Sequence, residues 1–272
     1  MGMFADYALS QRLERAEAGA NAAFVETRAR LAPETGATWI EVAGTYAMFD
    51  APDSPVTQTF GLGMFGEVTG HDLDLLEQFF FERNAAVHHE ISPLAHTSVW
   101  PLISSRGYAP VEFTSLLFLE LAAPPPPPSQ GLQVRVAMPA ESALWAKTAA
   151  AAWLSDHPEM AGALMPVMEN VFHVEGVTAF FAEKDGVPIA TAALNIRHGV
   201  GLLAGGSTVP EARKLGVQRA LLAARLRYAS AAGCDLAAMG ALPGSASQRN
   251  AERSGFRIAY TRTKWRREVP AV

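Results

Sequence analysis

A run of five consecutive prolines, Pro124–Pro128, divides the 272-residue chain near its middle. Consecutive prolines adopt polyproline II, which rises about 3.1 Å per residue and extends neither a helix interior nor a central strand. The segment 124–130 is therefore expected to be a stiff linker between two folded halves, residues 1–123 and residues 131–272. A ligand for a proline-binding partner is the alternative interpretation, but a linker already explains the run.

The two halves differ in charge. Residues 1–123 contain six Lys and Arg against sixteen Asp and Glu, a net charge of −10, and residues 124–272 contain sixteen against eleven, a net charge of +5. This division predicts that the basic half binds phosphates and that the acidic half attracts a cationic acceptor. Solubility alone is the alternative explanation for any single charge.

The cellular setting is predicted from what the sequence lacks. The single cysteine, Cys234, excludes a disulfide within the chain, and it is expected to be a small buried side chain and not an acyl-carrying nucleophile. The segment 1–17 has no apolar signal-peptide region, and no apolar run of eighteen residues occurs. We expect a cytoplasmic protein with no membrane partner, as a monomer or homodimer.

Periodicity predicts alternating helices and strands in the N-terminal half. In chain order they are a helix over 7–31, strands over 38–49 and 57–65, a helix over 71–84, a strand over 86–91, a helix over 98–105 and a strand over 111–121.

The C-terminal half follows a similar plan. Its expected elements are a strand over 132–137, helices over 141–153 and 161–172, strands over 178–183, 188–197 and 200–209, a helix over 216–232, a strand over 235–242, a helix over 247–253 and a strand over 258–266. Each half is thus predicted to be α/β, with a mixed central sheet flanked by helices. A weak repeat supports tandem halves, because Ser105–Val111 resembles Ser254–Ala259.

One stretch predicts anion binding. After the strand over 200–209, a short loop leads through Gly216 into the long helix over 216–232. The start of a helix presents unpaired N–H groups and the positive end of the helix dipole, and glycine lets a ligand approach the backbone closely. Arg213, Lys214 and Arg219 add cationic donors.

This stretch resembles the acyl-CoA-binding signature of the GNAT superfamily of N-acetyltransferases, which has Arg or Gln, two free positions, Gly, one free position, then Gly or Ala. Arg213 and Gly216 match the signature, whereas Gln218 departs from it. Its side chain either crowds the pyrophosphate or points away from it. Ser247–Phe256 is similar to the helix and Gly-Phe corner of that family, so the resemblance covers roughly residues 132–268.

The resemblance implies two GNAT-like domains and an acyl-CoA co-substrate, most simply acetyl-CoA. It implies direct acyl transfer to a small-molecule or peptide amine in a ternary complex, with the pantetheine arm between two splayed strands. The coenzyme-binding residues it implies are Gly206, Ser207, Thr208, Arg213, Lys214, Leu215, Gly216, Val217, Gln218, Arg219, Ser247 and Asn250.

The usual acid and base of the family do not carry over. Many members place a tyrosine where this chain has Ala251, and many place a glutamate on a central strand, where this chain has none. Asp156 and His157 are candidate acid–base groups, since histidine titrates near neutrality. A helix-capping pair before Pro158 is the alternative interpretation of these two residues.

Other motifs favour structural roles. The histidines His71, His88, His89 and His96, with Glu90, match no metal-ligand spacing, so we expect no metal. The basic and aromatic residues over 262–267 fit an alternating terminal strand, so we expect no nucleic-acid partner.

The N-terminal half has Gly61-Leu62-Gly63 but no equivalent of the signature, and it is predicted to be a degenerate GNAT-like domain with an acceptor-side or structural role. By analogy with tandem members of the superfamily, the acceptor is expected between the halves. The sequence thus predicts an acyl-CoA-dependent N-acyltransferase. A non-catalytic acyl-CoA sensor is the alternative.

Overall fold

The chain forms two compact units in a computed structural model that describes residues 4–121, 132–155, 158 and 161–270. Unit 1 comprises Met1–Leu117, Gly240–Gln248 and Ile258–Val272, and unit 2 comprises Phe118–Met239 and Arg249–Arg257. The proline run lies outside the described residues. The compact units therefore divide the chain differently from the expected boundaries 1–123 and 131–272, because the last strand belongs to unit 1.

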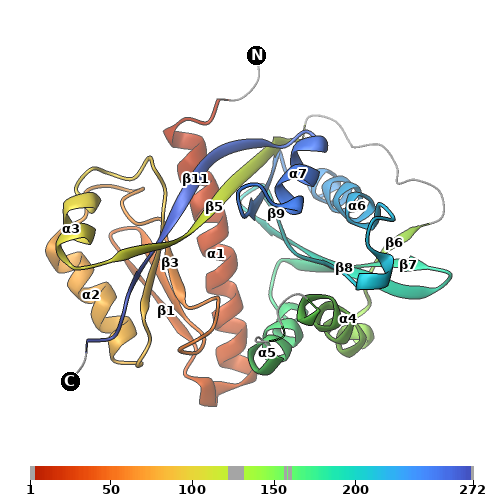
Figure 1. The fold of residues 1–272 in the computed structure, drawn as a ribbon, viewed down its shortest axis with the longest axis horizontal. Coiled ribbons are helices and arrows are strands. Elements are labelled where there is room, and N and C mark those ends of the chain that lie inside the picture. Colours follow the sequence, from red (N-terminus) through yellow and green to blue (C-terminus); the bar gives the residue numbers. More distant parts are fainter. Residues whose placement is uncertain (1–3, 122–131, 156–157, 159–160, 271–272) are drawn as a thin grey trace. The chain divides into compact units, whose positions relative to one another are not determined.

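Unit 1 is built on the strand order β1-β2-β3-β4-β11-β5, in which β3 and β4 are parallel and the other recorded pairs are antiparallel (Figure 1). Its elements are α1 (Tyr7–Leu31), η1 (Pro33–Thr35), β1 (Thr38–Val42), β2 (Thr45–Phe49), β3 (Gln58–Phe60), α2 (Gly70–Phe81), β4 (Val87–Ile91), α3 (Val99–Ser105), β5 (Ala109–Glu120) and β11 (Arg257–Arg267).

Local chemistry fixes the helix starts of unit 1. The Asp6 side chain accepts a hydrogen bond from the Leu9 amide at 2.9 Å and caps α1. Thr69 and Asp72 form a reciprocal capping box at the start of α2. The sequence predicted one strand over 38–49, but the structure has a hairpin there, because Ala43 and Gly44 both adopt positive φ, at 48° and 77°.

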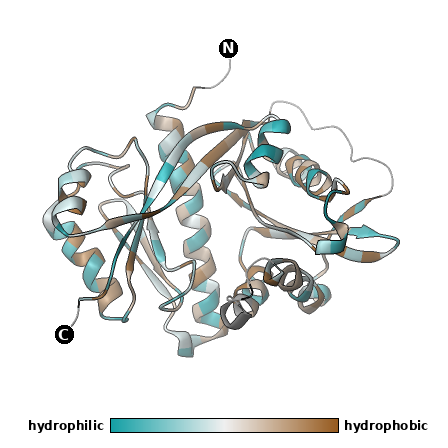
Figure 2. Cartoon of the chain, viewed as in Figure 1, coloured by the Kyte–Doolittle hydropathy of each residue, from teal (hydrophilic) through white to brown (hydrophobic). Residues whose placement is uncertain are grey.

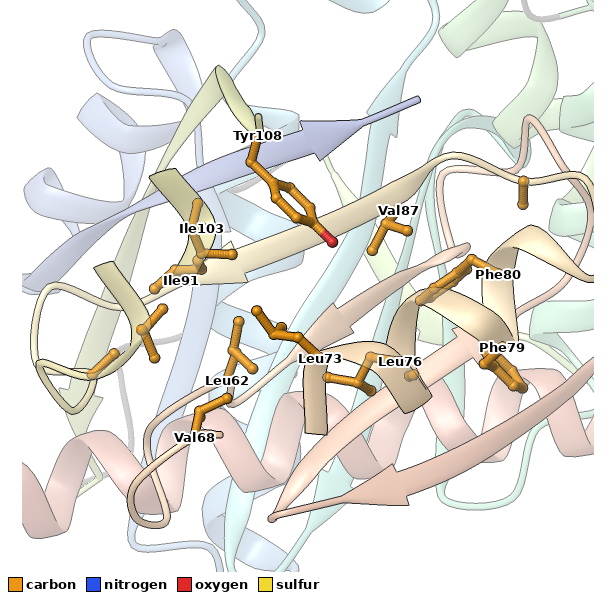
Figure 3. Close-up of a cluster of buried hydrophobic side chains, with 14 of the residues drawn as sticks. Leu62, Val68, Leu73, Leu76, Phe79, Phe80, Val87, Ile91, Ile103 and Tyr108 are labelled. Carbon is orange, nitrogen blue, oxygen red and sulfur yellow. The ribbon is translucent and has the colours of Figure 1, made fainter. Parts of the chain in front are cut away.

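Helices cover both faces of the sheet in unit 1. Ala47 and Phe49 of β2 join the apolar cluster formed with α2 and α3. Figure 3 shows Leu73, Leu76 and Phe80 of this cluster gathered near Val87 and Ile91 of β4.

Helix α1 covers the opposite face of that sheet. Successive strand residues alternate between faces, and the Arg15 guanidinium lies 4.9 Å from the centre of the Tyr46 ring. The buried residues of unit 1 therefore fill both sides of its sheet.

Strand β11 is held in unit 1 by buried charges as well as by its backbone pairing with β4. The Arg262 side chain is 1% exposed, and its Nη1 lies 2.8 Å from Glu17 Oε2 and 3.5 Å from Glu14 Oε2. Its Nε lies 3.4 Å from Glu90 Oε2. The Tyr260 hydroxyl donates to Glu14 Oε1 at 2.8 Å. These contacts join the two ends of the chain within one unit.

Unit 2 has the strand order β10-β9-β8-β7-β6, with a parallel β9–β10 pair and antiparallel pairs elsewhere. Its elements are β6 (Gln133–Val136), η2 (Pro139–Glu141), α4 (Ser142–Leu154), α5 (Ala161–Val171), β7 (Val177–Lys184), β8 (Val187–Arg197), β9 (Val200–Thr208), η4 (Pro210–Ala212), α6 (Val217–Ala231) and β10 (Leu236–Ala241). Helix α7 (Ala246–Arg253) divides between the units after Gln248.

The sheet of unit 2 lies between α4 and α5 on one face and α6 on the other (Figure 1). Phe181 packs with Trp145 of α4, whereas the neighbouring Phe180 stacks edge-on against Tyr228 of α6 at 5.7 Å. The Asp185-Gly186 turn joins β7 to β8 with both residues at positive φ, as the Asp-Gly pair predicts. The expected α/β class with mixed, helix-flanked sheets is confirmed.

Among the described residues, no helix is long and apolar enough to cross a membrane.

Candidate functional site

Two adjacent strands of unit 2 separate partway along their length. The parallel pairing of β9 with β10 runs from Val200↔Leu236 to Leu202↔Ala238 and ends there. Strand β9 continues to Thr208, and over this stretch its recorded pairing among the described residues is with β8 alone. Its backbone therefore has one edge at which an extended ligand can form strand-like hydrogen bonds.

A β-bulge lies within this open stretch. The β8–β9 register passes from Thr191↔Ser207 to Ala193↔Ala204, so Gly205 and Gly206 together stand opposite Ala192. Gly205 has a φ of 60°, a conformation that favours glycine. The bulge turns backbone groups away from the regular ladder, which is how a sheet aims them at a ligand.

The loop after β9 ends in an open helix start. Gly216 is the N-cap of α6 with a φ of 78°, and no side chain caps the helix. A Cβ atom added at Gly216 would meet nothing within 4 Å. The helical hydrogen bonds of α6 begin with the Ala220 amide, which donates to the Gly216 carbonyl at 3.1 Å. The amides of the preceding turn therefore face outward, beside the exposed Lys214 and Arg219, and can receive an anion.

The Arg213 side chain contacts the end of α4. Its Nη2 donates to the Ser155 hydroxyl at 2.7 Å and lies 3.5 Å from the Ala152 carbonyl, at the C-terminal end of α4. The signature arginine thus connects the loop to α4, where its charge complements the negative end of that helix.

Of the two orientations considered for Gln218, crowding the pyrophosphate or pointing away from it, the side chain adopts the one that leaves the helix start open. Its Nε2 donates to Thr208 Oγ1 at 2.7 Å, so the carboxamide bends back onto the end of β9. Its Oε1 lies 3.1 Å from the position that a Cβ atom would take on Gly206. Gln218 therefore leaves the outer side of the helix start open and covers the bulge instead.

The remaining coenzyme candidates differ in what they can offer. The Ser207 hydroxyl is buried and pairs with Thr191 Oγ1 at 2.8 Å, so only its backbone is available to a ligand. Leu215 is exposed in the loop, and Val217 is buried under the first turn of α6.

On α7, Ser247 is exposed and Asn250 is half-buried. Figure 2 shows α7 as a largely hydrophilic helix, and its Ala251 is 1% exposed. Helix α7 therefore has polar, solvent-accessible side chains at Ser247 and Asn250, while Ala251 belongs to the interior.

The acid–base candidates Asp156 and His157 lie outside the described residues. Strands β9 and β10 contain no acidic residue.

Two of the histidines that the sequence analysis considered, His89 and His96, make side-chain hydrogen bonds within unit 1. His89 is buried between Thr59 Oγ1 at 2.7 Å and the Tyr108 hydroxyl at 3.1 Å. Burial lowers the pKa of His89 to about 3, so its ring is neutral. Among the described residues, no group of His, Cys, Asp and Glu side chains is arranged to hold a metal ion.

The glycine turn of unit 1 is filled by protein. A Cβ atom at Gly63 would lie 2.6 Å from Val99 Cγ2, and one at Gly61 would lie 3.0 Å from the Phe65 ring. The Tyr7 hydroxyl and the Gln11 amide both donate to the Met64 carbonyl, at 2.6 and 2.7 Å. This turn differs from the open loop before α6, as the absence of the signature in this half predicts.

One residue of this region was not identified from the sequence. Arg225 lies on the buried face of α6, where its Nη1 donates to the carbonyls of Ala193 and Ala204 at 3.1 and 3.3 Å. The sequence did contain a signal for a buried arginine, because Arg225 falls within the apolar stripe formed by Leu222, Leu226 and Ala229.

Comparison with known proteins agrees with this geometry. Residues 144–256 match the model of the acetyltransferase (GNAT) family. The chain matches none of the curated proteins with which it was compared.

Solved structures resemble most of the chain. A GCN5-related N-acetyltransferase from Kribbella flavida is 19% identical, with a TM-score of 0.68 over 94% of this chain and 95% of its own. A tandem GNAT protein from the clavulanic acid biosynthesis pathway is 13% identical, with a TM-score of 0.57 over 75% and 69%. A putative GNAT acetyltransferase from Novosphingobium aromaticivorans is 15% identical, with a TM-score of 0.54 over 89% and 95%.

At these identities the structures establish a shared fold, which confirms the expected GNAT-like architecture over most of the chain. Residues 144–256 therefore lie in a domain that matches the GNAT acetyltransferase family.

Proposed function

We propose that the protein is an acyl-CoA-dependent N-acyltransferase, most simply one that transfers the acetyl group of acetyl-CoA to a primary amine. The observation that carries the proposal is the continuity of three features in unit 2. The open edge of β9 leads through the Gly205–Gly206 bulge to the uncapped start of α6 at Gly216. An extended pantetheine arm fits the strand edge, and a pyrophosphate fits the helix start.

The residues proposed to hold the coenzyme act mainly through their backbone. The amides from Lys214 to Arg219 would receive the pyrophosphate, and the exposed Lys214 and Arg219 side chains add charge. Gly206, Ser207 and Thr208 would pair with the pantetheine arm along β9. Ser247 and Asn250 of α7 remain the proposed contacts for its thiol end. Arg213 supports the loop from its position against Ser155.

In the proposed reaction, the neutral amine nitrogen attacks the thioester carbonyl and a tetrahedral oxyanion forms. The carbon–sulfur bond then breaks, coenzyme A leaves as its thiolate, and the proton lost by the amine restores the thiol. The protein would hold the two reactants together and stabilise the oxyanion with backbone donors of β9. Deprotonation of the amine is assigned to water, with His157 and Asp156 as the side-chain candidates.

The acceptor is proposed to be a cationic primary amine. Counted by compact unit, unit 1 has ten Lys and Arg against sixteen Asp and Glu, whereas unit 2 has twelve against eleven. Unit 1 thus remains acidic even though β11 brings four basic residues into it. A net negative charge attracts cations, so we propose that unit 1 has an acceptor-side role and draws the cationic amine toward the protein.

A non-catalytic acyl-CoA sensor is the second candidate. It is favoured by the buried Ala251 at the place of the family's usual tyrosine and by the absence of a glutamate on β9 and β10. The sensor hypothesis requires coenzyme binding without transfer.

An acceptor screen with the full chain separates these hypotheses. Acetyl-CoA is mixed with cationic, neutral and anionic amines, release of the coenzyme thiol is followed with a thiol reagent, and the product is identified by mass spectrometry. The single cysteine, Cys234, is buried, so the protein itself gives little background. Acetylation of a cationic amine supports the enzyme, binding without transfer to any amine supports the sensor, and failure to bind acetyl-CoA contradicts both.

A further inference from the structure

We propose that Arg225, assisted by Gln218, is a positioning residue that holds the Gly205–Gly206 bulge of β9 and strengthens its backbone N–H donors toward the acyl group. The inference rests on the proposed function, and it adds a role that neither the family match nor the fold assigns to these two side chains.

The hydrogen bonds of Arg225 reach both strands at one end of the bulge. Its Nη1 donates to the Ala193 carbonyl on β8 at 3.1 Å and to the Ala204 carbonyl on β9 at 3.3 Å. These residues are the last regular pair before the register shifts. One guanidinium therefore links the two strands where the regular ladder is interrupted, and its Nε is directed to the Leu221 carbonyl at 3.3 Å.

The charge of Arg225 has no carboxylate partner among the described residues. The buried Arg262 of unit 1 shows the usual arrangement, with three glutamates around it. Arg225 is 5% exposed and has carbonyl oxygens as its recorded partners. A buried cation without an anion is costly, and negative charge that develops nearby during the reaction would offset this cost.

Arg225 keeps its charge at neutral pH. Burial lowers its pKa to about 10, which still lies well above neutrality. The bulge is therefore held by a cation and not by a neutral donor.

Gln218 reaches the same point from the same helix, seven residues earlier. A Cβ atom on Gly206 would lie 3.1 Å from Gln218 Oε1 and 3.8 Å from Arg225 Nη2. Gln218 is also tied to Thr208 at the end of β9. Gly206 thus lies between two polar side chains of α6, which together fix the path of β9 through the bulge.

The chemical consequence follows from the peptide group that Arg225 contacts. The Ala204 carbonyl and the Gly205 N–H belong to one peptide unit. A charge-assisted hydrogen bond to the carbonyl polarises that unit and makes its N–H a stronger donor. A stronger donor beside the open edge of β9 stabilises an oxyanion more than it stabilises a neutral thioester, which is the condition for lowering the reaction barrier.

The test compares Arg225→Met, Arg225→Gln and Arg225→Lys in the full chain, with Arg30→Met as the control for loss of one positive charge at an exposed position. Removal of a whole oxyanion donor costs about 100-fold or more in kcat, so loss of its polarisation is expected to cost about tenfold. Arg225→Met and Arg225→Gln should lower kcat by about that factor and leave the Kd for acetyl-CoA within about threefold. Arg225→Lys should recover part of the loss, and Arg30→Met should match the parent.

Hydrogen exchange gives a readout that does not depend on activity. Peptides covering residues 200–208 should exchange at least several-fold faster in Arg225→Met, while peptides from unit 1 stay unchanged. If Arg225→Met does not fold, the Lys and Gln variants decide the question, because the proposal requires the charged variant to be the more active.

Parental kcat and exchange in Arg225→Met would overturn the proposal, as would a Gln variant at least as active as the Lys variant. If the parent protein binds no acetyl-CoA, the proposed function fails, and the exchange data alone then decide whether Arg225 holds the bulge.

Discussion

Replacement of Glu14 by glutamine should remove much of the pH dependence of the stability of unit 1. Glu14 is fully buried on α1, where Oε1 accepts a hydrogen bond from the Tyr260 hydroxyl and Oε2 lies 3.5 Å from Arg262 Nη1. Three glutamates surround that one arginine, so the cluster contains more negative than positive charge. Burial raises the pKa of Glu14 from 4.5 to about 7, although the nearby Arg262 acts in the opposite direction.

The size of the effect follows from proton linkage. At about 1.4 kcal/mol per pH unit, a rise from 4.5 to about 7 corresponds to roughly 3 kcal/mol of unfolding free energy. The folded state binds this proton more tightly than the unfolded state. The contribution is therefore fully present below about pH 4.5 and is lost as the pH rises through about 7.

The assay must report on unit 1 alone, because the chain has two compact units. Deuterium pulses along a urea series, with the α1 peptides read by mass spectrometry, give the free energy of unfolding of that region at pH 5 and at pH 8. The parent should lose roughly 2–3 kcal/mol more between these two pH values than Glu14→Gln, which keeps an acceptor for Tyr260. Equal pH dependence in both proteins would refute the argument.

Two further substitutions test the site. Gly206→Ala places a Cβ atom 3.1 Å from Gln218 Oε1, so it should lower kcat several-fold. The control is Gly19→Ala in α1, where an added Cβ atom meets nothing within 4 Å. This control should leave kcat unchanged and raise the free energy of unfolding by roughly 0.5–1 kcal/mol. Ala251→Tyr forces a ring into a position that is 1% exposed, so thermal unfolding should show a loss of about 1–3 kcal/mol or more, and an increase in turnover would show that the tyrosine reaches the reacting atoms.

Local sequence signals predicted most helices and strands because their causes are local. The apolar periodicity of α6 and the Asp185-Gly186 turn need no information from distant residues. The β1–β2 hairpin was missed because Ala43 is an unusual residue at positive φ. Membership of β11 in unit 1 was missed for a different reason, since its pairing with β4 joins strands far apart in the chain.

In the candidate site, too, the sequence predicted what depends on neighbouring residues and not what depends on the tertiary fold. Gly216 could be predicted, because a glycine at a helix start has a local meaning. The partners of Arg213 and Gln218 could not, because Ser155 and Thr208 reach them only through the tertiary fold. The role of Arg225 could not be predicted either, because the carbonyls of Ala193 and Ala204 reach it only through the tertiary fold.

Calorimetric titration of acetyl-CoA into the 272-residue chain tests the central claim most directly, with Gly216→Glu as the variant and Gly36→Glu as the matched control. Both glycines have positive φ, at 78° and 66°, and a Cβ atom at either meets nothing within 4 Å, so the two substitutions carry similar backbone strain. The account predicts saturable binding to the parent and to Gly36→Glu, and affinity at least tenfold weaker in Gly216→Glu, because the new carboxylate stands where the pyrophosphate would approach the helix start. Absence of binding to the parent, or equal affinity in all three proteins, would contradict it.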